Sequence, residues 1–220
     1  MSSLQSCLVR FILRRVKMWN KPLPEIRKAM EFLKAEPFPN SIRFMNKDLK
    51  GVPCNVFYQS DEVRKKVILY FHGGGFCLGI YNANRTFVAK IAERTKRDVC
   101  IPDYRLAPEN PFPSALEDAI AAYKGMLALG YKSEDIVLTG DSSGCALAIS
   151  ALLVLKQSGC AMPSMVMCIT PVFDLTGTGE TYITIAKKDP FQMIAPLCIA
   201  KIYKRQRSYI TLVIAFIWRT

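Results

Sequence analysis

Residues 135–155 read DIVLTGDSSGCALAISALLVL, and this stretch decides the fold. Its first five residues form a short apolar run with β-branched side chains, which predicts a buried strand over residues 135–139. The later part is apolar nearly all round as far as Lys156 and is followed by Gly159, which predicts a buried helix over residues 143–158. Between the two lies the turn Gly140-Asp141-Ser142-Ser143-Gly144.

A serine at the tip of such a strand-to-helix turn is held in a tight, strained conformation. Side chains two positions before and after it would collide there, which explains the glycines at positions 140 and 144. The turn exposes the Ser142 hydroxyl and points the helix N-terminus at the same spot. The Ser143 N–H and the helix dipole can then stabilise a developing negative charge on oxygen. Ser142 is therefore a candidate nucleophile.

From about residue 40 the chain alternates strands and helices. Apolar runs predict further strands over residues 42–46, 52–58, 66–71, 98–101 and 165–169. Helical spacing predicts helices over residues 82–95 and 114–129. This alternation favours an α/β fold with a mainly parallel central sheet that helices cover on both faces.

A second glycine-rich motif, His72-Gly73-Gly74-Gly75, directly follows the predicted strand over residues 66–71. Successive glycines expose backbone N–H groups and let a carbonyl oxygen approach closely. The motif can therefore complete an oxyanion hole with the Ser143 N–H. The alternative is a phosphate-binding turn, but neither the P-loop pattern nor a G-x-G-x-x-G that opens a helix is present here.

A third motif, DYRLAPE at residues 103–109, follows the predicted strand over residues 98–101. Its charged residues are Asp103, Arg105 and Glu109. We expect these charges to pair within the loop and to brace the glycine turn. The alternative is a loop with a structural role only.

Together the three motifs resemble the hormone-sensitive-lipase family of carboxylesterases, which has the α/β-hydrolase fold. The likeness covers about residues 40–195, and the matching stretches are HGGGFCLG (72–79), DYRLAPENPFPSALED (103–118), GDSSG (140–144) and TPVFDLT (170–176). It implies that Ser142 is the nucleophile and that the N–H groups of Gly74, Gly75 and Ser143 form the oxyanion hole. It gives structural support of the site to His72, Gly73, Gly140, Asp141, Gly144, Asp103, Arg105 and Glu109.

The chain also departs from this family. The family order is serine, acid, histidine, with both partners well downstream of the serine, but none of the 78 residues after Ser142 is a histidine. The sole histidine, His72, is expected to shape the glycine turn and not to act as the base. Asp174 is a structural aspartate in this family, and nothing places Lys187 or Lys188 near the serine.

An acid without an imidazole does not activate a serine. We therefore expect the chain to be inactive or very weak as an esterase. A smaller departure is Cys145, where the family usually has glycine, and we expect it to perturb the start of the following helix.

The two ends of the chain differ from its middle. The formal net charge is +12, and positive residues gather before Glu25 and over residues 201–207. No basic stripe alternates with aromatic residues, so nucleic-acid binding is not expected. Apolar residues at helical spacing over residues 4–19 predict a helix packed on its own domain, with contact to a membrane surface as the alternative. Residues 209–218 are predicted to form a buried strand, with a non-native tail as the alternative.

We divide the chain into N-terminal cap helices (1–38), an incomplete hydrolase core (39–195) that lacks the last strands of the fold, and a divergent basic and apolar tail (196–220). The eight cysteines are scattered without zinc-type spacing. This favours a reducing compartment, and we expect a cytoplasmic protein. No metal and no cofactor are expected, and the oligomeric state is left open.

Three functions stay open on this evidence. The first is a carboxylic ester hydrolase for small acyl esters that was shortened by a frameshift, an early stop or gene decay. The second is a catalytically dead hydrolase fold that binds a small ligand. The third is a membrane-associated or oligomeric protein that uses its basic, apolar ends.

Overall fold

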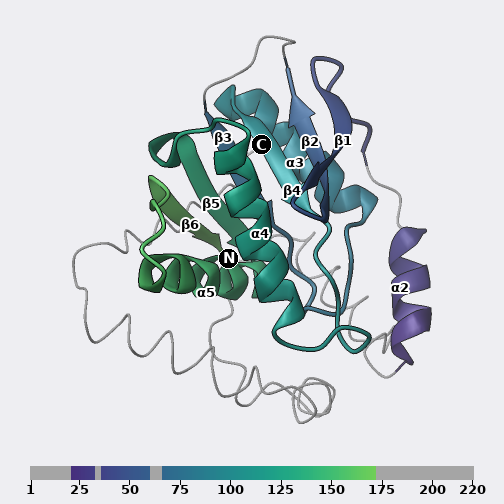
Figure 1. Cartoon of the computed structure of the whole chain (residues 1–220). Helices are drawn as coiled ribbons and strands as arrows, with labels where there is room; N and C mark the ends of the chain where they lie inside the picture. The colour runs from purple at the N-terminus through teal and green to yellow at the C-terminus, as the bar shows by residue number, and fades with distance from the viewer. Residues whose placement is uncertain (1–20, 33–35, 60–65, 172–220) are drawn as a thin grey trace, which may run out of the picture.

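The computed structural model describes residues 21–32, 36–59 and 66–171 (Figure 1). In chain order the elements are α2 (Leu23–Glu31), β1 (Arg43–Leu49), β2 (Val52–Tyr58), β3 (Val67–Phe71), α3 (Asn82–Thr95), β4 (Asp98–Pro102), α4 (Ser114–Ala128), the short 3-10 helix η2 (Ser133–Asp135), β5 (Ile136–Asp141), α5 (Ser143–Gln157) and β6 (Met165–Ile169). Each strand and helix predicted within the described residues is present, with ends that shift by up to three residues.

The strands form a single sheet in the order β1-β2-β4-β3-β5-β6. β1 and β2 are an antiparallel hairpin that turns at Lys50 and Gly51, and β2 runs antiparallel to β4. β4, β3, β5 and β6 are parallel to one another. The expected mainly parallel sheet is therefore confirmed.

Helices cover both faces of this sheet (Figure 1). Side chains of β3 alternate between the faces, as a pleated strand requires. Val67, Leu69 and Phe71 pack in one core with residues of α4 and α5. Ile68 and Tyr70 pack in a second core with residues of α3. The α/β-hydrolase architecture expected from the sequence is thus present.

The register of β3 and β5 positions the candidate site. The two strands are neighbours, and Phe71 at the end of β3 pairs with Gly140 near the end of β5. The carboxyl ends of parallel strands meet at the same edge of a sheet, where ligands commonly bind. The glycine motif that follows β3 and the serine turn that follows β5 are therefore side by side.

α2 is the part of the predicted N-terminal cap that the structure describes. Its Ile26 packs with Cys77, Leu78 and Tyr81, which come shortly after the glycine motif. The helix is therefore fastened to the loop that follows β3. The remaining predicted cap residues 1–20 and the predicted tail 196–220 lie outside the described residues.

Candidate active site

Ser142 lies in the turn between β5 and α5, with φ 50° and ψ −120°. A positive φ is strained for a residue with a Cβ atom, and such strain is typical of functional turns. A Cβ atom on Gly144 would lie 2.1 Å from the Phe71 carbonyl oxygen, and one on Gly140 would lie 2.7 Å from the same oxygen. The two glycines are therefore required because the turn packs directly against the end of β3.

The glycine turn, residues 72–75, is bound to this serine turn on both sides of Ser142. The Gly73 N–H donates to Asp141 Oδ1 over 2.8 Å, and the Gly75 N–H donates to Ser143 Oγ over 2.9 Å. Asp141 and Ser143, on either side of Ser142, thus each accept a hydrogen bond from one N–H group of the glycine turn. Sequence reasoning expected the two motifs to meet, and the structure brings them together.

Asp141 links the glycine turn to the sheet. Besides the Gly73 N–H, its Oδ1 accepts a hydrogen bond of 2.6 Å from the Tyr70 hydroxyl. Burial, together with the charge of Asp141, raises the pKa of Tyr70 well above its ordinary value, so this hydroxyl stays protonated and continues to donate. Sequence reasoning missed Tyr70 because it looked like one more apolar residue of a buried strand.

His72 is fully buried at the start of the glycine turn. Its ring stacks on Tyr104 with centroids 4.2 Å apart, and its Nδ1 lies 2.9 Å from the Gly73 carbonyl oxygen. The Tyr104 hydroxyl donates to the His72 carbonyl oxygen over 2.7 Å. Nε2 has no hydrogen-bond partner among the residues that the structure describes. The ring thus contacts the glycine turn at the Gly73 carbonyl oxygen and packs on the loop at residues 103–109 through Tyr104.

Comparison with known proteins places this arrangement in a family. Residues 68–210 match the model of a family described as alpha/beta hydrolase fold. The chain belongs to the α/β-hydrolase family. Among solved structures it resembles an esterase from the bacterial hormone-sensitive lipase family, with 34% sequence identity and a TM-score of 0.68 over 85% of this chain and 68% of that one. An esterase/lipase from an uncultured bacterium gives 31% identity and a TM-score of 0.71 over 90% and 68%.

Curated relatives of this α/β-hydrolase chain include an esterase of Acinetobacter venetianus, 39% identical over 132 residues, and an acetyl-hydrolase of Streptomyces hygroscopicus, 37% identical over 119 residues. These matches cover 60% and 54% of the chain. The chain spans only 44% and 40% of the length of these two relatives. The resemblance to the hormone-sensitive-lipase type is thereby confirmed for the matched part.

The buried imidazole of His72 predicts a pH dependence of stability. Burial lowers the pKa of His72, although the hydrogen bond with Gly73 and the charges of Asp103 and Asp141 act in the opposite direction. Between the lowered pKa and the unfolded value of about 6.5 the unfolded chain binds more protons at this residue, so its effect on stability is absent above about pH 6.5 and grows as the pH falls below it. We expect the free energy of unfolding in urea to decrease by up to about 1.4 kcal/mol per pH unit below about pH 6.5. His72→Asn should remove this slope, and an identical slope in that variant would contradict the assignment.

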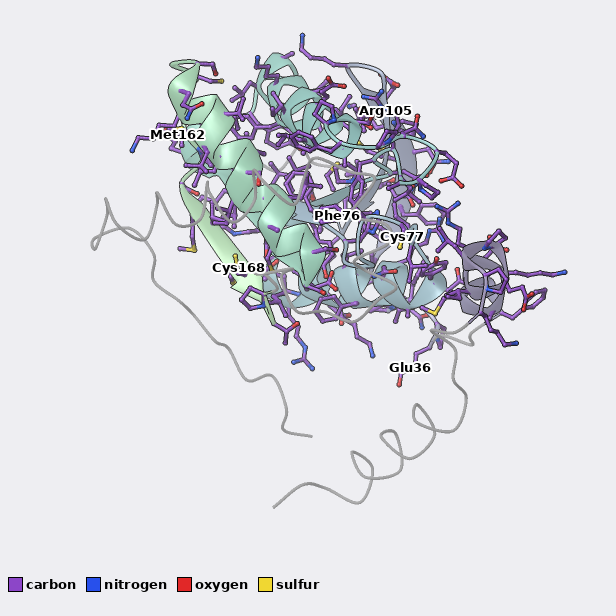
Figure 2. The ribbon with its side chains drawn as sticks, turned by 90° about the horizontal axis from the view of Figure 1, so that it is seen from below. Glu36, Phe76, Cys77, Arg105, Met162 and Cys168 are labelled. Atoms are coloured by element: carbon purple, nitrogen blue, oxygen red, sulfur yellow. The ribbon has the colours of Figure 1, made fainter. Side chains whose placement is uncertain are left out.

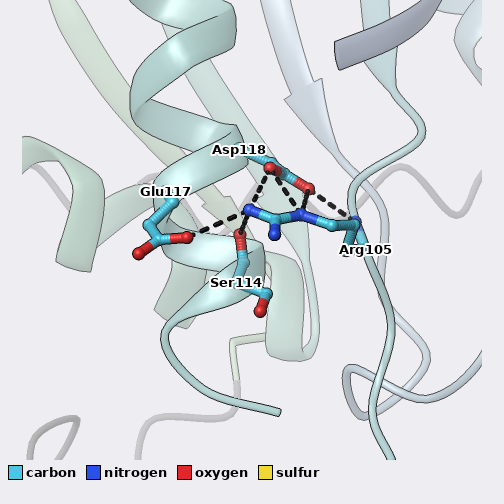
Figure 3. Close-up of polar contacts among 4 residues, drawn as sticks. All are labelled: Arg105, Ser114, Glu117 and Asp118. Carbon is cyan, nitrogen blue, oxygen red and sulfur yellow. Dashed lines mark hydrogen bonds and ion pairs between the residues drawn. The ribbon is translucent and has the colours of Figure 1, made fainter. Parts of the chain in front are cut away.

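The charges of the loop at residues 103–109 do not pair with one another, so that expectation is wrong. The Arg105 guanidinium instead binds both carboxylate oxygens of Asp118 and reaches Glu117, both in α4 (Figure 3). Glu109 binds Arg27 of α2 through two hydrogen bonds of 2.7 and 2.9 Å. Arg105 and Glu109 thus anchor the loop to α4 and α2, respectively.

The loop does brace the glycine turn, but through uncharged groups. The Ala107 N–H donates to the Phe76 carbonyl oxygen over 2.9 Å, and Tyr104 holds His72 as described above. Arg27 joins the two loops, since it also donates to the carbonyl oxygens of Cys77 and Ala107 over 2.8 and 2.9 Å. Figure 2 shows Phe76 and Cys77 close together, with Cys77 toward α2.

Asp118 and Glu117 provide a matched pair for testing how this loop is anchored. The Asp118 side chain is 11% exposed and also accepts the Arg105 backbone N–H over 2.8 Å, whereas the Glu117 side chain is 59% exposed. We expect Asp118→Ala to destabilise the fold by about 2 kcal/mol, because the backbone N–H and the guanidinium of Arg105 both lose a largely buried, charged acceptor. Glu117→Ala should cost about 0.5 kcal/mol or less. Equal losses in urea unfolding would contradict the anchoring role of Asp118.

Cys145 fits the helix without disturbing it, contrary to expectation. α5 runs from Ser143 to Gln157 without interruption. The Cys145 thiol is buried and donates to the Gly140 carbonyl oxygen over 2.9 Å. The start of α5 therefore accommodates the Cys145 side chain, whose thiol forms a hydrogen bond with β5, the strand that precedes Ser142.

The part of the chain that the structure describes contains no group of three histidine, cysteine or acidic side chains arranged to hold a metal ion. None of its helices combines the length and the apolar character that a membrane crossing requires.

Proposed function

We propose that this chain carries the nucleophile and the oxyanion hole of a carboxylic ester hydrolase that acts on small acyl esters. The observation that carries the proposal is the strained turn at Ser142, whose two neighbours each bind one N–H of the glycine turn. Matches to an esterase and an acetyl-hydrolase support the reaction class.

In the proposed reaction the Ser142 oxygen attacks the acyl carbonyl carbon. The carbonyl oxygen becomes an oxyanion beside the N–H groups of Gly74, Gly75 and Ser143, and the N-terminus of α5 adds the favourable end of its dipole. Collapse of the tetrahedral intermediate releases the alcohol and leaves an acyl-enzyme, which water hydrolyses.

The step that these 220 residues do not provide is removal of the serine proton. Their sole histidine, His72, is fully buried at the start of the glycine turn, where it stacks on Tyr104, and burial lowers its pKa. We therefore propose that the chain by itself is inactive or very weak as an esterase.

We further propose a reducing compartment such as the cytoplasm. All six cysteines of the described residues are free thiols, which is the usual state in such compartments.

A fluorophosphonate in excess and over a long incubation tests the proposed nucleophile, because the oxyanion-hole donors still favour slow attack by the Ser142 oxygen when no histidine takes its proton. We expect intact-mass spectrometry to show one adduct, peptide mapping to place it on Ser142, and Ser142→Ala to abolish it. Ser158→Ala is the matched control at the other end of α5 and should label like the unchanged chain. Equal labelling of the unchanged chain and Ser142→Ala would refute the proposal.

A second candidate is a ligand-binding protein that keeps the pocket of a hydrolase without its turnover. One observation favours it. Asp141 and Ser143 hold the glycine turn through hydrogen bonds, while the sole imidazole, that of His72, is fully buried. A small ester or acid that raises the melting temperature without being turned over would favour it. Ser142-dependent turnover would exclude it.

A further inference from the structure

The side chain of Ser143 has a role that its place in the serine turn does not require. Its N–H is expected to serve the oxyanion hole, which needs only the backbone. Yet its hydroxyl is buried at 2% exposure and accepts the Gly75 N–H over 2.9 Å. An alanine at this position would present the same backbone N–H and leave the Gly75 donor without that acceptor.

The Gly75 N–H is one of the donors that an acyl oxygen on Ser142 would use. One N–H group makes one well-aligned hydrogen bond, and alignment weakens steeply when the donor is shared between two acceptors. The Ser143 hydroxyl and an incoming acyl oxygen therefore compete for the same donor. Of the two competitors, the Ser143 hydroxyl belongs to the protein itself. It is attached to the residue next to the nucleophile, so it cannot diffuse away as a water molecule can.

We propose that the Ser143 hydroxyl is a built-in occupant of the oxyanion hole, which holds the Gly75 N–H in the empty site and must release it when an acyl oxygen enters. The proposal deepens the proposed function and rests on it. Ser143 is thus a positioning residue, since it acts on the acyl group through Gly75. In the empty site the same hydrogen bond keeps the glycine turn docked on α5.

A purely structural tether would behave differently. If the hydroxyl served only to dock the turn, its removal would loosen the turn and weaken binding of an acyl oxygen. If it occupies the donor, its removal frees the donor and strengthens that binding. The sign of the change therefore separates the two roles.

The same helix offers a matched control. Ser150 lies two turns further along α5 and is equally buried at 3% exposure, but its hydroxyl has no hydrogen-bond partner among the described residues. Ser150→Ala therefore removes the same group from the same helix without touching the glycine turn. Ser143→Thr keeps the hydroxyl at the site itself.

The experiment uses NMR on the ¹⁵N-labelled 220-residue chain, with butyrate as a probe whose carboxylate oxygen mimics the acyl oxygen. In Ser143→Ala we expect the Gly75 amide to exchange with solvent at least about tenfold faster, because a hydrogen bond is lost. We expect butyrate to bind about 3- to 10-fold more tightly, the range that corresponds to one neutral hydrogen bond. Ser143→Thr should restore both values, and Ser150→Ala should change neither.

Unchanged exchange at Gly75 in Ser143→Ala would overturn the proposal, as would butyrate binding that stays equal, weakens, or is absent from both proteins. Fluorophosphonate labelling of the same samples keeps the two claims separate. Tighter butyrate binding without labelling at Ser142 would defeat the proposed nucleophile and leave the occupant role of Ser143 standing. Labelling at Ser142 with no effect of Ser143→Ala would do the reverse.

Discussion

Gly144→Ala is expected to destabilise the fold by about 3 kcal/mol or more, since it forces a side chain into a fully packed site. The added Cβ atom would lie 2.1 Å from the Phe71 carbonyl oxygen and 2.8 Å from the His72 carbonyl oxygen. Both are backbone atoms at the junction of β3 and the glycine turn, so relief requires moving the turn away from α5. The loss should be visible as a lower urea midpoint and as loss of any reactivity of Ser142.

The matched control is Gly79→Ala, a few residues beyond the glycine turn. There the new Cβ atom would meet only Leu106 Cδ1 at 3.5 Å, an ordinary van der Waals contact. We expect a change within about 0.5 kcal/mol. If Gly144→Ala were as mild as Gly79→Ala, the serine turn would not be packed against β3 as described.

The second large effect concerns turnover. We expect Ser142-dependent hydrolysis of p-nitrophenyl butyrate by the 220-residue chain to be on the order of 10⁶-fold slower than in a serine hydrolase with its histidine, because nothing takes the serine proton. The measurement is the rate of the unchanged chain minus the rate of Ser142→Ala.

His72→Asn is the control for this prediction. The histidine packs against Tyr104 and the Gly73 carbonyl oxygen, so the variant should leave the small Ser142-dependent rate about the same while it alters stability. Fast turnover that Ser142→Ala abolishes would show that another group accepts the serine proton, and a residual rate that disappears in His72→Asn would show that the reaction depends on His72. Either result would contradict the prediction.

The serine turn was predictable because its pattern is local: two glycines flank the serine within five residues, and the strand and helix on either side show their own patterns. The atoms that a Cβ at Gly144 would meet, in contrast, belong to Phe71 and His72 and are supplied by the fold. The meeting of the two glycine-rich motifs was predictable for a similar reason, since each follows a parallel strand. Strand ends were less predictable: β1 continues to Leu49 because Leu49 pairs with Val52 across the hairpin, which its own side chains do not indicate.

The polar contacts around the site were not predictable in the same way. Arg27 and Glu109 are 82 positions apart, and only the docking of α2 on the two loops brings them together. Arg105 had nearer acidic neighbours in the sequence, yet it binds Asp118 because α4 returns past the loop. The Ser143 hydroxyl finds its partner 68 positions earlier in the chain. Charge complementarity alone therefore identified the anchoring residues but assigned them the wrong partners.

The most direct test is the crystal structure of the chain after prolonged reaction with an excess of a small alkyl fluorophosphonate, which allows for slow attack by a serine without a base. The phosphorus on Ser142 then stands for the acyl carbon, and its non-ester oxygen stands for the oxyanion. We predict this oxygen within about 2.7–3.1 Å of the Ser143 amide nitrogen and of a glycine-turn amide nitrogen. An adduct whose oxygen points away from residues 73–75, or an adduct on another side chain, would contradict the account.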